Sequence, residues 1–523
     1  MRTRIFSFIV ILVIILLGGT MLFQYAPNQN AGYGCSGCNI IMIDLSNVSA
    51  ENMGLYGYNR NTTPFLEEFA KDALVFDDFF APTSWTLPNA TSLFTSLYPY
   101  THNVLNRYPY NVLSENIKTF PEVLGENGYK TFAIVGGLDY SARFGHMRGF
   151  DDVVEQREID LTERDGVRAV FDRTFADTFK TALSWIKKAD GEKFFLFLHG
   201  YDAHCPFVPP PETEGVWSDK NNTSITVDNS ICYRGFRNEE TGTYKASYYL
   251  PRSGRFSQEK GVKEELVKEI EFTERDIAYL RDLYDEEVFS LDKLLESFIG
   301  GLDKRTLNNT VIIIFSDHGE MFAKHGRFGR AGSVRGTLYD DVMHVPLIIK
   351  VPGAPGKRVF GITQFIDVVP TLMEMLEIKP KDMRMQGKSA LPLITRGEKI
   401  NEYAYSGSLY GSKRNLFYDK VSVNESIRDE KWKLIREGIL DINTGALLEE
   451  EAEIVEQTFE LYDLVNDPEE FNNVAEENPE VFERLKARLE EWAVSSRTFL
   501  NETPGTEELP EEFIEEARKR GYW

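Results

Sequence analysis

The sequence predicts an α/β fold: a doubly wound, mostly parallel sheet with a smaller C-terminal α+β subdomain. Short apolar runs rich in β-branched residues, such as NIIMI at 39–43 and VIIIF at 311–315, are typical of strands buried on both faces. Helical patterns separate these runs, and regular alternation of strand and helix favours a parallel sheet. Polar residues follow directly where several runs end. Ligands of such sheets bind just beyond the carboxyl ends of the strands, so the fold class also predicts where the functional site lies.

Residues 1–24 differ from the rest of the chain because a basic cluster is followed by an almost wholly apolar run. Arg2 and Arg4 precede an apolar stretch that extends to Phe23, close to the ~20 residues needed to cross a bilayer. With the positive charge on this side, the rest of the chain is expected outside the cytoplasm. No small-x-small cleavage site follows the run, so we expect a transmembrane signal anchor; a cleaved signal peptide, which would release the protein, is the alternative. Residues 25–38 are predicted to form a linker.

Composition and cysteine usage narrow the functional classes. Lys and Arg number 58 against 82 Asp and Glu, a net charge of −24, which argues against nucleic-acid binding because that depends on neutralising phosphates. The four cysteines form an even set, which outside the cytoplasm favours the pairs Cys35–Cys38 and Cys205–Cys232. A zinc site at Cys35-x-x-Cys38 would lack its second pair of ligands.

The predicted catalytic domain, residues 39–395, is built from strands and helices in turn. A polar stretch at 212–254 is expected to be an insertion over the site. The strands are expected at 39–43, 131–135, 194–199, 311–315 and 346–351. Helices are expected to begin at Thr63-Pro64 and near Asn89, to end within 122–128, and to span about 262–299 and 365–376. Beyond it, residues 396–500 are predicted to form the α+β subdomain, with antiparallel strands at 402–410 and 431–436 and a helix at 479–495. Residues 501–523 form an acidic tail.

Two of the buried strands deliver acids at the same kind of position. Asp44 ends the first strand, and Asp317 with His318 follows the strand at 311–315. Carboxylate oxygen and imidazole nitrogen together suit divalent cations such as Mn or Zn, so a shared metal site is predicted at this edge of the sheet. The alternatives are a polar turn after the strand at Asp317 and a helix cap at Asp44.

Several segments, in order, resemble the sulfatase family of the alkaline phosphatase superfamily, over almost all of residues 39–473. These segments are NIIMIDLS at 39–46, GLYGY at 54–58, TPFLEEFAKDALVFDDFFAPTSWTLPNATSLFTSLYP at 63–99, FIDVVPTLMEML at 365–376 and ELYDLVNDPEEFNNVA at 460–475.

The resemblance implies roles for individual residues. Thr86 stands at the position of the family's nucleophile, two residues before Pro88, and His204 and Arg335 match positions that serve the substrate or the leaving group. It also implies one divalent ion, Mn, Mg or Ca with Zn possible, held by Asp44, Thr86, Asp317 and His318. A bound cation makes the alkoxide of a hydroxyl nucleophile accessible at neutral pH. His325 lies near enough in the sequence to contribute.

Three departures from the family pattern concern sulfate handling. Sulfatases carry Cys or Ser in Cys/Ser-x-Pro-x-Arg, which is oxidised to formylglycine, whereas this chain has Thr86 followed by Ala90 at the arginine position. Gly136–Asp139 replaces a Gly-Lys-x-His element, and Leu45 replaces a second Asp. Threonine cannot form the aldehyde. The remaining set is similar to the threonine-dependent members, which include lipoteichoic acid synthases and phosphoethanolamine transferases.

We therefore expect an extracytoplasmic, metal-dependent hydrolase of sulfate or phosphate esters that uses Thr86. Its partners would be an ester substrate, on a glycan or a lipid head group, and the membrane through the anchor. One alternative is a phosphoethanolamine- or phosphoglycerol-type transferase acting on a membrane lipid or glycan; another is an inactive sulfatase-like binding protein. Thr86 could instead cap the helix near Asn89, Ser84 could be the nucleophile if the register slips by two, and His204 could simply bind a backbone carbonyl.

Overall fold

A computed structural model gives the fold of the chain. It describes residues 32–105, 110–155, 160–164, 167–171, 174–189, 191–227, 235–237, 241–251, 264–329, 337–410, 420–441, 454–500 and 505–507. The predicted anchor (1–24), Arg335 and Cys232 lie outside these residues. Among the helices of the described residues, none has both the length and the apolar character needed to cross a membrane.

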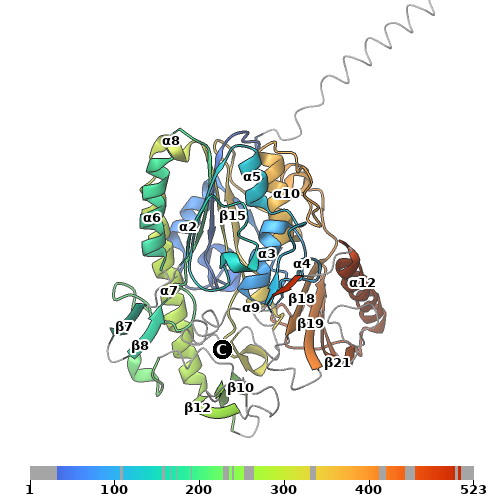
Figure 1. The fold of residues 1–523 in the computed structure, drawn as a ribbon. Coiled ribbons are helices and arrows are strands. Elements are labelled where there is room, and N and C mark those ends of the chain that lie inside the picture. Colours follow the sequence, from blue (N-terminus) through green and yellow to red (C-terminus); the bar gives the residue numbers. More distant parts are fainter. Residues whose placement is uncertain are drawn as a thin grey trace, which may run out of the picture.

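An eight-stranded sheet forms the centre of the molecule, with β1 (Asn39–Asp44) in its interior (Figure 1). β1 runs parallel to both neighbours, β13 (Thr310–Phe315) and β9 (Phe194–His199). The strand order is β16 (Lys357–Val359), β2 (Leu74–Phe76), β15 (Leu347–Lys350), β13, β1, β9, β5 (Lys130–Val135) and β6 (Asp152–Glu155). Only β15 runs against its neighbours, so the prediction of a mostly parallel sheet is confirmed.

Helices cover both faces of this sheet, as a doubly wound fold requires. Successive residues of β1 point to opposite faces, so Ile40 and Met42 join one apolar cluster while Ile41 and Ile43 join the other. The first cluster includes side chains of α3 (Thr86–Thr95), α5 (Phe120–Glu126) and α10 (Phe365–Met375). The second includes α2 (Pro64–Phe69), α6 (Phe175–Lys188) and the long α7 (Glu274–Gly300), and the two groups of helices lie on opposite sides of the sheet in Figure 1.

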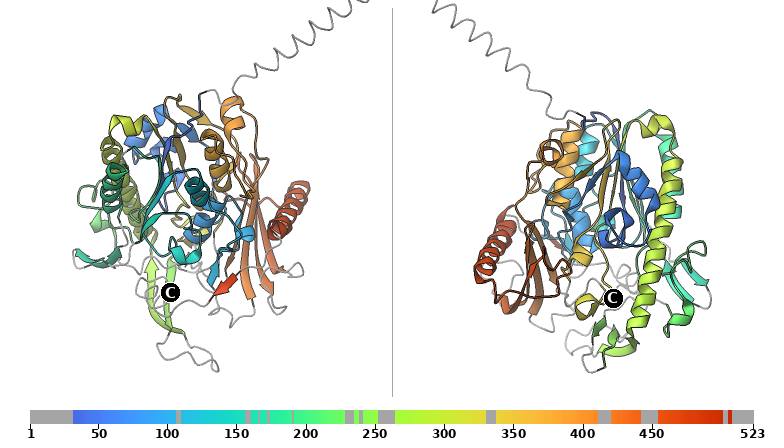
Figure 2. Two further views of the ribbon diagram at one scale, coloured as in Figure 1. Left: turned by 45° about the horizontal axis from the view of Figure 1, so that its top comes forward. Right: turned by 180° about the vertical axis from the view of Figure 1, so that it is seen from behind.

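The C-terminal subdomain is a four-stranded antiparallel sheet with one helix packed on it (Figure 2). Its strands are β18 (Ala404–Tyr410), β19 (Lys420–Arg428), β20 (Trp432–Asp441) and β21 (Ile454–Asp463), and its helix is α12 (Pro479–Thr498). Leu485, Leu489 and Trp492 of α12 join the apolar cluster of this subdomain. The antiparallel strands and the helix predicted here are therefore confirmed.

The edge strand β18 runs beside the segment that leads into α3. The Gly407 amide donates to the Pro82 carbonyl at 2.9 Å, and the Ser406 hydroxyl donates to the Ala81 carbonyl at 2.8 Å. The hydroxyls of Thr83 and Ser408 are also hydrogen-bonded to each other. The subdomain thus binds residues 81–83, which precede α3, through backbone and hydroxyl hydrogen bonds.

The helix predicted at 262–299 is wrong in its first part. Residues Glu264–Phe272 form strand β12, which pairs with β11 (Tyr244–Pro251), and α7 begins only at Glu274. The Thr273–Asp276 capping box marks the true start of the helix. The polar stretch at 212–254 accordingly contains strands, since β10 (Gly235–Arg237) pairs with β11 and with β14 (Arg327–Phe328).

Smaller elements complete the described fold. The acidic tail contributes a strand, because β22 (Gly505–Glu507) pairs with β4 (Tyr110–Val112). The other short pairs are β3 (Phe79–Phe80) with β17 (Thr363–Gln364) and β7 (Asp160–Arg164) with β8 (Val167–Phe171), and the short helices are α4 (Pro99–His102), α8 (Lys304–Leu307), α9 (Asp340–Met343) and α11 (Leu391–Arg396).

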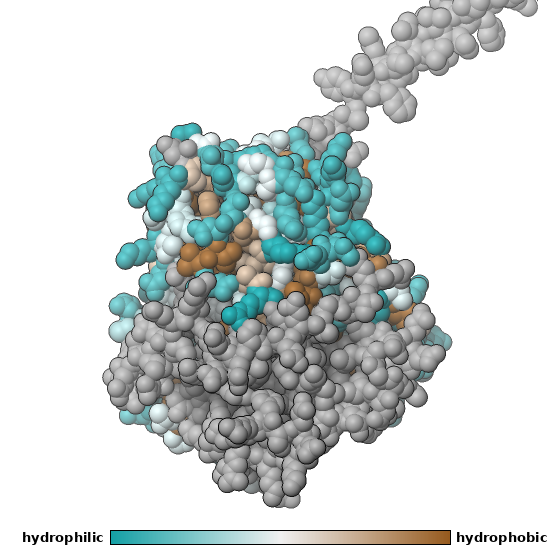
Figure 3. Space-filling model, viewed as in Figure 1, coloured by the Kyte–Doolittle hydropathy of each residue, from teal (hydrophilic) through white to brown (hydrophobic). Residues whose placement is uncertain are grey.

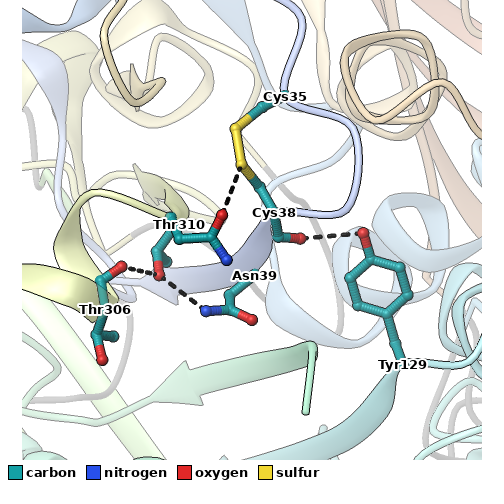
Figure 4. The surroundings of a disulfide bond; sticks show 7 residues. Cys35, Cys38, Asn39, Tyr129, Thr306 and Thr310 are labelled. Atoms are coloured by element: carbon teal, nitrogen blue, oxygen red, sulfur yellow. Dashed lines mark hydrogen bonds between the residues drawn. A yellow bond between two sulfur atoms is a disulfide. The ribbon is translucent and has the colours of Figure 1, made fainter. Parts of the chain in front are cut away.

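A disulfide between Cys35 and Cys38 lies immediately before β1 (Figure 4). The Tyr129 hydroxyl donates to the Cys38 carbonyl at 3.0 Å, and Tyr33 and Cys38 are buried. The last residues of the predicted linker at 25–38 therefore pack on the domain, while its boundaries stay a prediction. Cys205 is also disulfide-bonded, while its predicted partner lies outside the described residues.

Hydrophilic residues cover most of the described part of the face shown in Figure 3, with apolar residues in small patches. The large apolar side chains exposed among the described residues are scattered along the chain, at Val216, Phe360, Val465, Phe471 and Val494. Such scattered positions are normal for a folded domain.

Candidate active site

The two predicted strand-end acids lie side by side. β1 and β13 are adjacent and parallel, with Asp44 opposite Phe315, so Asp317 follows at the same edge of the sheet. The Asp317 amide donates to Asp44 Oδ1 at 3.1 Å, and both side chains are buried. The topology therefore brings together two carboxylates separated by more than half the chain.

Thr86 is the first residue of α3 and faces His318. Its Oγ1 lies 3.2 Å from His318 Nε2, and the side chain is buried. The helix begins at Thr86 and not near Asn89, and Trp85 occupies the cap position without a side-chain cap. Thr86 is thus not the helix cap that its sequence position allowed.

Asn89 fixes the first turn of α3 against the end of β13. Its Nδ2 donates to the Thr83 carbonyl at 2.8 Å and to the Asp317 carbonyl at 2.7 Å. Its Oδ1 accepts from the Thr83 amide at 3.1 Å. The buried amide therefore sets the distance between the strand that carries Asp317 and the helix that carries Thr86.

The hydrogen bonds of His318 define its tautomer. Nδ1 lies 3.1 Å from the Gly319 carbonyl, which can only accept, so Nδ1 carries a proton. In the neutral ring Nε2 then has a lone pair, and it lies 3.2 Å from Asp317 Oδ2 as well as near Thr86. The lone pairs of His318 Nε2 and Asp317 Oδ2 therefore face each other and repel unless a proton or a cation lies between the two atoms.

The surroundings of Asp44 favour a cation. Oδ1 accepts from the Ser46 amide at 3.0 Å and from the Asp317 amide, and Oδ2 accepts from the Tyr140 hydroxyl at 2.5 Å. Burial, and then the charge of Asp317, raise the pKa of Asp44 well above its usual range. A positive ion beside the two carboxylates would remove this electrostatic cost.

The residues fit a divalent metal in chemistry. Two carboxylates, a hydroxyl and an imidazole lie at this end of the sheet, and His318 donates its other ring N–H to a backbone carbonyl, as metal-binding histidines do. As the side chains stand, the described residues contain no group of three or more His, Cys, Asp or Glu that could hold an ion. The ligand set of Asp44, Thr86, Asp317 and His318 stays a prediction.

His204 lies in the loop after β9. Its Nδ1 lies 2.8 Å from the Cys205 carbonyl, and its ring packs 4.6 Å from the ring of Tyr201. Tyr201 packs in turn on His199, the residue opposite Asp44 in the sheet, and His199 packs on Tyr140. His204 is therefore connected to Asp44 through a row of aromatic rings.

Gly137 leaves room for Tyr201. A Cβ at position 137 would lie 2.4 Å from the Tyr201 hydroxyl oxygen, and the backbone there has φ of +74°. The phenol thus occupies the space of a side chain at the position where the resembled family has lysine.

His325 lies away from this cluster. Its ring stacks 3.7 Å from that of Tyr339 and lies 5.3 Å from Phe471, toward the C-terminal subdomain. Burial and the nearby cation of Lys433 lower its pKa to about 4. The sequence neighbourhood alone had suggested a contribution to the site; Arg335, the other outlying candidate, is not among the described residues.

Tyr140, Asn89 and His199 were missed as site residues from the sequence. His199 ends a buried strand, so the strand-end rule that found Asp44 could have found it. Tyr140 lies in the loop after β5, where no periodic pattern indicates which side chain turns inward.

Comparison with known proteins supplies the family. The sulfatase family model matches residues 39–378, and a model described as "N-sulphoglucosamine sulphohydrolase, C-terminal" matches residues 333–495. Arylsulfatase K of Rattus norvegicus is 24% identical over 82% of this chain and 72% of its own length. N-acetylglucosamine-6-O-sulfatase of Bacteroides thetaiotaomicron is 22% identical over 83% of this chain and 82% of its own.

Solved structures agree on the fold. The phosphonate monoester hydrolase of Agrobacterium radiobacter has a TM-score of 0.63 at 18% identity, covering 91% of this chain and 98% of that one. A protein in complex with its substrate D-glucosamine-2-N,6-O-disulfate has a TM-score of 0.62 at 19% identity, covering 88% and 98%.

Proposed function

The chain belongs to the sulfatase family of ester hydrolases, and we propose that it hydrolyses a sulfate or phosphorus ester with Thr86 as the nucleophile. The observation that carries the proposal is the contact of Thr86 Oγ1 with His318 Nε2, beside the paired acids Asp44 and Asp317. The relatives named arylsulfatase, N-acetylglucosamine-6-O-sulfatase and phosphonate monoester hydrolase all act on such esters. These relatives are hydrolases. They therefore give no support to a transferase or to a binding protein, the two alternatives, or to the likeness to lipoteichoic acid synthases.

The chain itself orients the nucleophile. Without an ion, the Thr86 hydroxyl donates to the lone pair of His318 Nε2, so the oxygen lone pairs are directed away from the imidazole; as a ligand of an ion, His318 would use that lone pair for the ion instead. Thr86 also opens the ten-residue α3, whose N-terminal amides and dipole favour the anionic group of an ester. Attack by Oγ1 on sulfur or phosphorus would release the alcohol, and we assign its protonation to His204, in the loop after β9. Water would then hydrolyse the threonyl ester.

A divalent ion fits this scheme. Sulfatase-family enzymes generally bind one. Asp44, Thr86, Asp317 and His318 would hold it here, and when bound it would stabilise the Thr86 alkoxide and the charge on the transferred group. Oxygen-rich ligands make Mn, Mg or Ca a better fit than Zn.

The choice between sulfur and phosphorus follows from threonine chemistry. A formylglycine hydrate has a second hydroxyl that can expel sulfate, whereas the Thr86 ester needs an attacking water. We therefore propose that a phosphodiester or phosphonate ester is turned over faster than an aryl sulfate.

Substitutions in α3 test whether Thr86 is the nucleophile. The assay is hydrolysis of an aryl sulfate and of a bis-aryl phosphate with Mn. Thr86→Ala should lower kcat by at least about 10³-fold, because nucleophile losses are of this order or larger, and Thr86→Ser should keep part of the activity. Thr91→Ala is the matched control, since Thr91 is buried in the same helix and its hydroxyl donates to the Leu87 carbonyl. If Thr86→Ala and Thr91→Ala are equally active, Thr86 is not the nucleophile.

We further propose that the domain acts outside the cytoplasm, on an ester of a glycan or a lipid head group. The bonded Cys35–Cys38 pair and the disulfide-bonded Cys205 support an oxidising compartment, where disulfides form and persist. Protease added to intact cells should remove the domain from an anchored protein, and protection of the domain would contradict this location.

A further inference from the structure

We propose that Tyr140 is a positioning residue for Asp44: its buried hydroxyl orients the carboxylate and thereby sets the affinity of the site for a divalent cation. The inference rests on the metal site of the proposed function. Its basis is the 2.5 Å hydrogen bond from the Tyr140 hydroxyl to Asp44 Oδ2. This length is at the short end of the range for an O–H donor on a carboxylate, where such bonds are strongest.

Asp44 depends on Tyr140 for one of its two oxygens. The backbone amides of Ser46 and Asp317 both donate to Oδ1. Oδ2 accepts from Tyr140, and neither Asp44 nor Tyr140 is exposed to solvent. Loss of the phenol hydroxyl would leave a buried carboxylate oxygen without this donor, and only the hydrogen bonds to Oδ1 would then orient the carboxylate.

The ring of Tyr140 is itself held by the sheet. It packs 4.5 Å from His199 and 5.2 Å from Phe197, measured between ring centroids. Both residues belong to β9, which pairs with β1 in the register that places His199 opposite Asp44. The donor and the acceptor are therefore positioned by neighbouring strands, so the hydrogen bond has little freedom to change its length.

A phenol suits a carboxylate that must bind a cation. A lysine or arginine partner would cancel the charge of Asp44, whereas a neutral hydroxyl orients the carboxylate and leaves its charge for the ion. A tyrosine hydroxyl is a neutral donor at ordinary pH. The same loop carries Gly137, whose missing side chain is replaced in space by the Tyr201 phenol.

The test measures metal binding directly. The full-length protein, stripped with EDTA, is titrated with MnCl₂ by isothermal titration calorimetry, as wild type, Tyr140→Phe and Tyr129→Phe. Tyr140→Phe should weaken Mn binding about 10- to 100-fold, the usual cost of removing a partner of a metal ligand. Tyr129→Phe is the matched control: Tyr129 is buried and donates one hydrogen bond, but to Cys38 before the start of β1. Its Mn affinity should equal that of the wild type.

The outcomes separate this inference from the proposed function. Equal Mn affinity of Tyr140→Phe and wild type would overturn the role of Tyr140 while leaving the metal site intact. Wild-type protein that binds none of Mn, Mg and Ca would overturn the metal site and this inference with it, whereas the Thr86 assay would still report on the nucleophile. Thermal unfolding in EDTA gives the second measurement. If Tyr140→Phe does not fold there while Tyr129→Phe does, Tyr140 serves the fold and the inference is overturned.

Discussion

Replacing Asn89 by alanine tests how α3, the helix that begins with Thr86, is held against the end of β13, the strand that precedes Asp317. Asn89 is fully buried and makes three hydrogen bonds, to the Thr83 amide, the Thr83 carbonyl and the Asp317 carbonyl. Each buried group that loses its partner costs about 1–3 kcal/mol. Even at the low end, three groups give a loss of about 3 kcal/mol in the free energy of unfolding.

The loss should be measured by urea unfolding followed by tryptophan fluorescence, beside Asn127→Ala as control. Asn127 is exposed and makes one side-chain hydrogen bond, to the Val123 carbonyl, so its removal should cost about 1 kcal/mol or less. Activity should fall further in Asn89→Ala, because a shift of about 1 Å between Thr86 and Asp317 is enough for a 10²-fold loss. Equal unfolding free energies for the two variants would refute the reasoning that Asn89 joins α3 to β13.

Two further predictions concern a buried histidine and a crowded glycine. Burial lowers the pKa of His102 to about 3, so the unfolded chain binds a proton below about pH 6.5 that the folded chain does not, and stability is lost as the pH falls. Urea unfolding should therefore show the wild type losing about 2 kcal/mol relative to His102→Gln between pH 7 and pH 5; a constant difference would contradict this. Gly137→Ala should destabilise the protein more than Gly353→Ala, because both have φ of +74° but only at position 137 does the new Cβ meet Tyr201. Equal melting temperatures of these two variants would show that Tyr201 does not occupy the space.

The strand-end rule accounts for much of what the sequence predicted about the site. Asp44 and Asp317 follow runs whose apolar character is local and easily recognised, and parallel strands meet at one edge whatever their order. Thr86 was found differently, by resemblance, since its position at the start of α3 and its contact with His318 depend on how the helix packs. The sequence alone favoured a helix start three residues later.

The parts that were missed depend on long-range contacts. Tyr140 reaches Asp44 across 96 positions of the chain, from a loop with no periodic pattern. Strand β12 was predicted as helix because its apolar residues adjoin those of α7 and were read with the same period. Local propensity could not separate the two without the pairing of β12 with β11.

The contact of β18 with the segment before α3 bears on when the enzyme can become active during synthesis. The carbonyls of Ala81 and Pro82 are bound by Ser406 and Gly407, which are made more than three hundred residues later. A chain still emerging from the ribosome can form β1, β5 and β9, but it lacks the strand that supports the entry to Thr86. Thr86, the proposed nucleophile, therefore gains this support only after Gly407 has been made. For a hydrolase made in a cell that contains its own esters, this order of assembly delays activity until synthesis is nearly complete.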